Sequence, residues 1–124
     1  METRSAPRAH VNAEIAFFID GGEEQKFHLP KNTKFPARLS SISVLGLSMI
    51  CDKMLPKGLV IKLEVPGEPF LFQETMHIKG EVRYCRQVML SEYNCGIKFL
   101  DIQRDHKDRI AAFVASHRKD VKHD

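Results

Sequence analysis

Alternation of apolar and polar residues with a period of two runs through most of the chain and is the feature that most constrains its fold. In residues 11–17 the apolar positions are Val11, Ala13, Ile15 and Phe17, and an Asp-Gly-Gly turn signal follows at 20–22. A period of two places successive side chains on opposite faces of a β-strand. The pattern therefore predicts antiparallel strands that each bury one face.

Turn residues separate the other segments with this pattern. Strands are expected near Phe27 and Leu29 (a short edge strand), within 37–51, within 59–65 before Pro66-Gly67, within 69–90 as one long strand or two short ones around Gly80, and within 91–102. In 37–51, Ile42 and Val44 share one face, which turns Ser41 and Ser43 outward. Gly46 interrupts this run and marks a bulge, a tight corner or a close backbone approach.

The periodicity changes near the C-terminal end. From about Asp105, the apolar residues Ile110, Phe113 and Val114 recur at spacings of three and four, which predicts an amphipathic helix. Several antiparallel strands before one helix predict an all-β fold, a small antiparallel β-barrel of about six strands whose C-terminal α-helix lies against one opening. We expect a flexible N-terminal arm at 1–10, the barrel and helix at 11–116, and a charged tail at 117–124.

Composition limits the function classes. The 124 residues suffice for one domain, and 43% hydrophobic with 28% charged residues is typical of a globular protein. The net charge of +3 suits a small anionic ligand but falls short of a dedicated nucleic-acid binder. RNA or single-stranded DNA is also disfavoured because the chain has no Trp to stack on bases. No apolar run predicts a membrane span or a signal peptide, so we expect a cytoplasmic protein.

Cysteine and histidine spacing predicts no metal site. An odd number of cysteines, Cys51, Cys85 and Cys95, argues for reduced thiols. In a hairpin, Cys85 and Cys95 would lie opposite each other, as small packing residues or as a redox pair. No paired-carboxylate, Ser-His-Asp or Cys-His motif is present, so we predict neither an enzyme nor a cofactor.

Four short motifs follow one another along the chain. Arg4 and Arg8 form R-x-x-x-R in a segment without apolar periodicity, residues 41–46 read S-x-S-x-x-G, and the segments GEVRY (80–84) and CGIKF (95–99) precede the helix. Taken singly, the arginines fit a solubilising tail, and Ser43 and Gly46 fit a polar strand face with a bulge.

Together, in this order, the motifs resemble those of the PilZ domain family, whose members bind the bacterial second messenger cyclic di-GMP. The resemblance assigns Arg4, Arg8, Ser43 and Gly46 to the family's arginine, serine and glycine positions. Ser41 stands where the family has Asp or Asn, and Tyr84 where it often has Trp. It implies a receptor whose N-terminal arm closes over the nucleotide and signals to a protein partner, for example in motility, pilus or exopolysaccharide machinery.

The chemistry agrees with that assignment and leaves one alternative open. Arginine forks bind phosphates and guanine edges bidentately. Tyr84, Arg38 and Arg83 are further candidate ligand contacts. The alternative role of Tyr84 is a core or rim aromatic, and that of the two arginines is surface charge. Ser41 lacks the charged acceptor of a carboxylate. A lost hydrogen bond of about 1.5–3 kcal/mol weakens binding roughly ten- to a hundredfold. The alternative is therefore a degenerate protein-interaction adaptor that does not bind the nucleotide.

Overall fold

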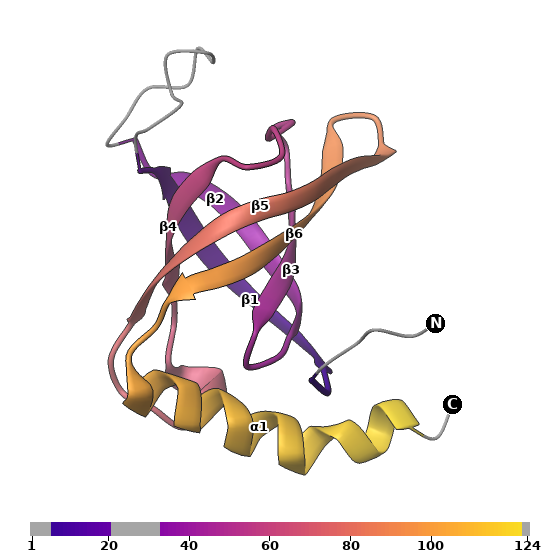
Figure 1. Ribbon diagram of the computed structural model, residues 1–124. Coiled ribbons are helices and arrows are strands. Elements are labelled where there is room, and N and C mark those ends of the chain that lie inside the picture. The colour runs from indigo at the N-terminus through magenta and orange to yellow at the C-terminus, as the bar shows by residue number, and fades with distance from the viewer. Residues whose placement is uncertain (1–5, 21–32, 123–124) are drawn as a thin grey trace.

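The computed structural model describes residues 6–20 and 33–122, and these form a six-stranded barrel with one long helix (Figure 1). The elements are β1 (Ala9–Ile19), β2 (Phe35–Ile42), β3 (Gly46–Cys51), β4 (Val60–Val65), the short 3-10 helix η2 (Glu68–Phe70), β5 (Met76–Met89), β6 (Glu92–Asp101) and α1 (Arg104–Lys122). Each predicted segment within the described ranges contains a strand, and 69–90 contains one long strand rather than two.

The strands close into a barrel in the order β1-β2-β3-β6-β5-β4, and every neighbouring pair is antiparallel. Closure pairs β1 with both β2 and β4, which leaves no unpaired strand edge in the described barrel. The predicted all-β barrel with a terminal helix is therefore confirmed.

Alternating side chains fill the barrel. On β1, Ile15, Phe17 and Ile19 are buried, and their neighbours are partly or fully exposed. Inward residues from the other strands meet them, among them Leu39, Met49, Ile61, Leu63, Ile78, Val82 and Ile97. Each large apolar side chain that is fully buried stabilises the fold by about 1.5–3 kcal/mol. Burial of the apolar face that alternates along each strand is therefore the main source of the fold's stability.

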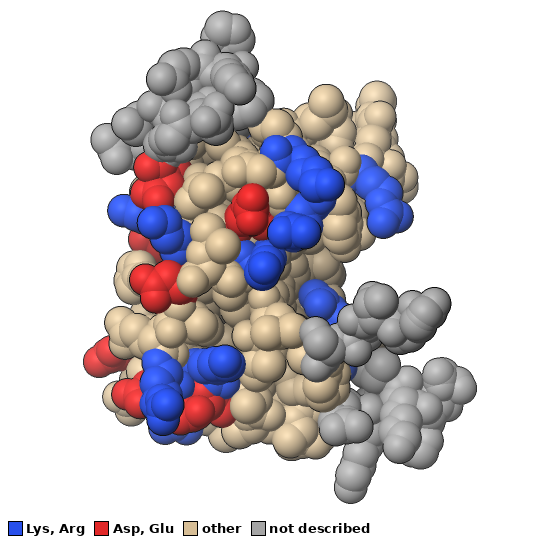
Figure 2. All heavy atoms as spheres, in the orientation of Figure 1, with Lys and Arg blue, Asp and Glu red and all other residues tan. Residues whose placement is uncertain are grey.

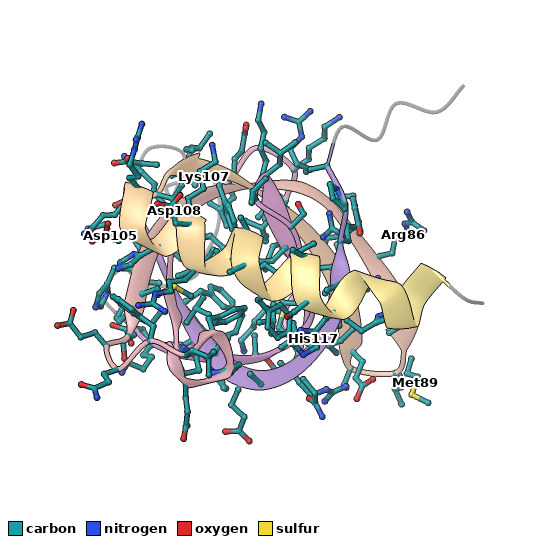
Figure 3. The ribbon with its side chains drawn as sticks, turned by 90° about the horizontal axis from the view of Figure 1, so that it is seen from below. Arg86, Met89, Asp105, Lys107, Asp108 and His117 are labelled. Carbon is teal, nitrogen blue, oxygen red and sulfur yellow. The ribbon has the colours of Figure 1, made fainter. Side chains whose placement is uncertain are left out.

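The helix α1 crosses the lower opening of the barrel, as seen from below in Figure 3. Ile110 and Val114 are buried against the core, and the ring of Phe113 packs edge-on against Phe70 of η2 at 4.9 Å between centroids. The three residues that predicted the amphipathic face are thus among those that attach the helix. Among the described helices, α1 included, none is long and apolar enough to cross a membrane.

Two predicted boundaries need correction. The strand β1 begins at Ala9, which is buried, so the barrel starts before the expected arm of residues 1–10 ends. The helix continues to Lys122, beyond the expected limit of 116, because no glycine or proline follows its apolar part to end it. Arg4 and the expected edge strand at Phe27 and Leu29 lie outside the described residues.

Candidate functional site

One row of short outward-facing residues crosses four strands and forms the floor of a basic pocket. Ser41 on β2 pairs with Ser48 on β3, Ser48 pairs with Gly96 on β6, and Gly96 pairs with Tyr84 on β5. Two serines and a glycine carry little side-chain bulk, so the surface is hollowed between larger side chains at either end of the row. The open pocket has a volume of about 450 Å³.

The walls of this pocket carry positive charge. It is lined by Arg8, Ser41, Leu45, Gly46, Leu47, Ser48, Arg83, Tyr84, Gly96, Ile97, Lys98 and Phe99, a set that includes three cations and no carboxylate. Lys and Arg side chains also gather over β5 and β6 in Figure 2, with acidic groups among them. A hollow of this size and charge favours an anionic ligand.

Arg8 lies at the mouth of the pocket, directly before β1. Its Nε donates a hydrogen bond of 3.3 Å to the hydroxyl of Ser41, a residue 33 positions away in the sequence. The pairing of His10 with Ser41 between β1 and β2 brings the two side chains together. The structure thus joins two of the residues that the sequence motifs singled out.

Ser41 belongs to a serine cluster that links β2 to β3. Its hydroxyl lies 2.7 Å from the Ser48 hydroxyl, which lies 2.9 Å from that of Ser40. A register shift between Leu39 and Ser41 brings both β2 serines to the same partner. Ser48 was not among the predicted site residues, although its alternation with the buried Leu47 and Met49 is a signal that it faces outward.

Ser43 does not face the pocket, so the expectation that it points outward is wrong. Its side chain is 1% exposed, its oxygen accepts a hydrogen bond from the Leu45 amide at 3.1 Å, and it donates one to the Gly46 carbonyl at 3.4 Å. The strand ends at Ile42, so the alternation on which the expectation relied stops there. Ser43 instead holds the turn that places Gly46.

Gly46 is required by a close approach between two backbones. A Cβ at this position would lie 2.2 Å from the carbonyl oxygen of Ile97 on β6. Of the three explanations that the sequence left open for this glycine, the close approach is confirmed. Gly46 also lines the pocket, so its contact with a ligand stays a prediction.

Tyr84 faces outward because of a β-bulge. Tyr84 lies two residues after the buried Val82, so strict alternation along β5 would also place its side chain in the core. The register of β5 against β6 shifts between these two residues. Tyr84 is 37% exposed, and its ring lies on Gly96, where a Cβ would come within 2.2 Å of it. The guanidinium of Arg86 lies 4.8 Å from the ring centroid. The core alternative for Tyr84 is therefore wrong.

The remaining candidate cations divide between the pocket and other surfaces. Arg83 and Lys98 line the pocket, and Arg83 also lies 3.6 Å from a carboxylate oxygen of Glu81. Arg38 is exposed on β2 beside His10 and Asn12 and does not line the pocket with Arg8. Lys98 was missed by the sequence analysis, although its place between the inward Ile97 and Phe99 marks it as outward-facing.

Within residues 6–20 and 33–122, no group of three His, Cys, Asp or Glu side chains is arranged to hold a metal ion.

Comparisons with solved structures show proteins with a similar fold. The structure is similar to that of the Bacillus subtilis inhibitor of motility MotI/DgrA, with a TM-score of 0.75 and 9% sequence identity. That match covers 100% of this chain, which spans 55% of the Bacillus chain. It is also similar to the PilZ domain of YcgR from Escherichia coli solved with c-di-GMP, with a TM-score of 0.62, 12% identity and coverage of 98% and 96% of the two chains.

At this identity the structural matches show the fold alone. No curated protein sequence matches the chain. The model of the PilZ domain matches residues 2–116, which is almost the whole chain. This is a family of receptor and adaptor domains without catalytic activity, in agreement with the prediction that the chain is not an enzyme. The chain therefore belongs to the PilZ domain family.

Proposed function

We propose that this protein is a cyclic di-GMP receptor whose N-terminal arginines close over the nucleotide against the floor formed by Ser41, Ser48 and Gly96. The observation that carries the proposal is the contact of Arg8 with Ser41 at the mouth of a pocket with a cationic lining. Ser41 and Gly46 are the further ligand contacts in this proposal, and Ser43 supports the turn between them.

The ligand's chemistry fits the lining. Cyclic di-GMP carries two phosphates and two guanine edges that offer acceptor atoms. Arg8, with Arg4 before it, supplies guanidinium forks for either group, and Arg83 and Lys98 add positive charge on the opposite side. Tyr84 offers an aromatic ring at the end of the floor, on which a base can stack in place of the Arg86 guanidinium.

Similarity also supports a signalling output in motility. One similar structure is an inhibitor of motility, and the other is a PilZ domain solved with c-di-GMP. We propose that nucleotide binding orders the N-terminal arm and that a protein partner of the motility machinery recognises the changed surface. As the receptor of a bacterial second messenger, the protein acts in the cytoplasm in this proposal.

Calorimetric titration with cyclic di-GMP tests the proposal. We expect saturable binding to the wild-type chain and a loss of at least tenfold in affinity for Arg8→Ala and for Arg4→Ala, because each removes charge-assisted hydrogen bonds. Arg38→Ala is the matched control, since it removes the same side chain from a surface outside the pocket, and its affinity should be unchanged. Equal losses in Arg8→Ala and Arg38→Ala would refute the site.

Ser41 favours a second candidate, a PilZ-fold adaptor that does not bind the nucleotide. Its hydroxyl is engaged by Arg8 and Ser48, and it cannot supply the charge of the family's carboxylate. Titration of Ser41→Asp separates the two candidates. Binding by the wild-type chain supports the receptor, whereas binding that appears only in Ser41→Asp identifies the adaptor.

A further inference from the structure

The three cysteines of the chain gather in the barrel behind the pocket floor. Cys95 on β6 is directly opposite Cys85 on β5, as the hairpin prediction required, and their sulfur atoms lie 3.1 Å apart. Cys51 on β3 approaches Cys95 from the other side, at 3.9 Å between sulfurs. Cys95 is therefore the central thiol, with two neighbours at unequal distances.

The three thiols differ in access to solvent. Cys95 is 0% exposed and Cys51 is 5% exposed, whereas Cys85 is partly exposed. The sulfur of Cys85 also accepts hydrogen bonds from the Leu55 amide at 3.3 Å and from the Cys95 thiol. Its access to solvent makes Cys85 the thiol that a small oxidant meets first.

The protonation states of Cys95 and Cys51 distinguish the roles of these two thiols. The hydrogen bond to Cys51, together with burial, raises the pKa of Cys95 and keeps it a thiol at neutral pH. The same contact lowers the pKa of Cys51 to about 7, but that sulfur is enclosed in the core. Cys95 is therefore placed to react second, with a neighbour that has already been oxidised.

We propose that Cys85 and Cys95 form an oxidation site, in which a hydroperoxide such as hydrogen peroxide converts the two thiols into a cross-strand disulfide. In the first step, the Cys85 thiol attacks hydrogen peroxide and the O–O bond breaks. Cys85 becomes a sulfenic acid, and the thiol proton joins the departing hydroxide to form one water. In the second step, the Cys95 thiol attacks the sulfenic sulfur and its proton passes to the departing hydroxyl. The S–S bond forms, the S–O bond breaks, and a second water leaves.

This bond would lie next to the pocket floor. Cys85 follows Tyr84 and Cys95 precedes Gly96, and these two pocket residues are paired with each other. A disulfide one residue away fixes the spacing of β5 and β6 where the Tyr84 ring rests on Gly96. The oxidation site does not depend on the proposed nucleotide, so it can be tested without it.

Trypsin separates the three cysteines, which makes the linkage easy to assign. Cleavage after lysine and arginine places Cys51 in residues 39–53, Cys85 in 84–86 and Cys95 in 87–98. The folded full-length chain is treated with hydrogen peroxide, free thiols are alkylated, and the digest is analysed by mass spectrometry without reduction. We expect peptide 84–86 linked to 87–98 as the main product, within a chain that stays monomeric on a non-reducing gel.

Two variants complete the experiment. Cys51→Ala should form the same linkage, whereas Cys85→Ala should lose it and retain its fold by circular dichroism. A main product joining 39–53 to 87–98, a disulfide between two chains, or a linkage that appears only after denaturation in urea would each overturn the proposal.

Discussion

At the scale of single residues, two glycines of the pocket meet different obstacles. A Cβ on Gly46 would meet the backbone of β6 at Ile97, whereas a Cβ on Gly96 would meet the ring of Tyr84. Backbone in a paired strand cannot move without loss of ladder hydrogen bonds. A partly exposed ring can turn away. The same added methyl group therefore has different consequences at the two positions.

We predict that Gly46→Ala lowers the free energy of unfolding by about 2–3 kcal/mol, as expected for overpacking against a rigid neighbour. Gly96→Ala should cost less than about 1 kcal/mol and shift the fluorescence of Tyr84. Urea unfolding of both variants measures the difference. Equal losses of stability would show that the strands approach less closely at Gly46 than described.

Ser43 provides a second residue-scale prediction. Because its hydroxyl bonds to the Leu45 amide and the Gly46 carbonyl, Ser43→Ala should lower the free energy of unfolding by about 1 kcal/mol. Ser40→Ala, which removes a hydroxyl from the serine cluster, is the comparison. If Ser43→Ala weakens cyclic di-GMP binding by more than its stability loss explains, the hydroxyl contacts the ligand after all.

At the scale of elements, the β5–β6 hairpin has a turn residue in the left-handed conformation. Its two strands are joined by Leu90 and Ser91, and Ser91 has a φ of 65°. A left-handed conformation costs a non-glycine residue about 1–2 kcal/mol, part of which glycine recovers.

We predict that Ser91→Gly raises the free energy of unfolding by about 0.5 kcal/mol and that Ser91→Val lowers it by about 1 kcal/mol. Leu90→Gly is the control, because Leu90 is not in the left-handed region and a glycine there gains nothing. Chemical denaturation midpoints report all three. A gain in Leu90→Gly equal to that in Ser91→Gly would point to turn flexibility rather than relief of strain.

At the scale of the whole molecule, a ligand that joins Arg8, directly before β1, to β2, β3, β5 and β6 stabilises the closed barrel as one unit. If the proposed receptor function is right, cyclic di-GMP at a hundred times its Kd adds about 2.7 kcal/mol to the free energy of unfolding. For a domain of this size, that gain raises Tm by roughly 10 °C.

Thermal unfolding followed by circular dichroism checks this prediction, with GMP as the control nucleotide and Arg8→Ala as the control protein. Neither control should shift Tm by more than a small fraction of the wild-type effect. A rise in Tm that is the same with Arg8→Ala would place the nucleotide elsewhere on the barrel.

The sequence by itself determined the strands, the helix and the fold family. Residues such as Ile15 and Phe17 on β1, or Ile110 and Val114 on α1, carry a periodicity that local geometry converts directly into a buried face. It also indicated Arg8, Ser41 and Gly46 as parts of one site, since their motifs keep a recognisable order. These features depend on intervals along the chain, which a sequence contains in full.

Only the tertiary structure decided which side chains share the pocket. The bulge before Tyr84 turned that residue outward, the end of β2 at Ile42 buried Ser43, and pairing across β3 and β6 brought Ser48 and Lys98 to the site. Arg38 lines a separate hollow beside His10 and Asn12. A register shift of one residue reverses the direction of a side chain, and registers are fixed by contacts between strands that are distant in the sequence.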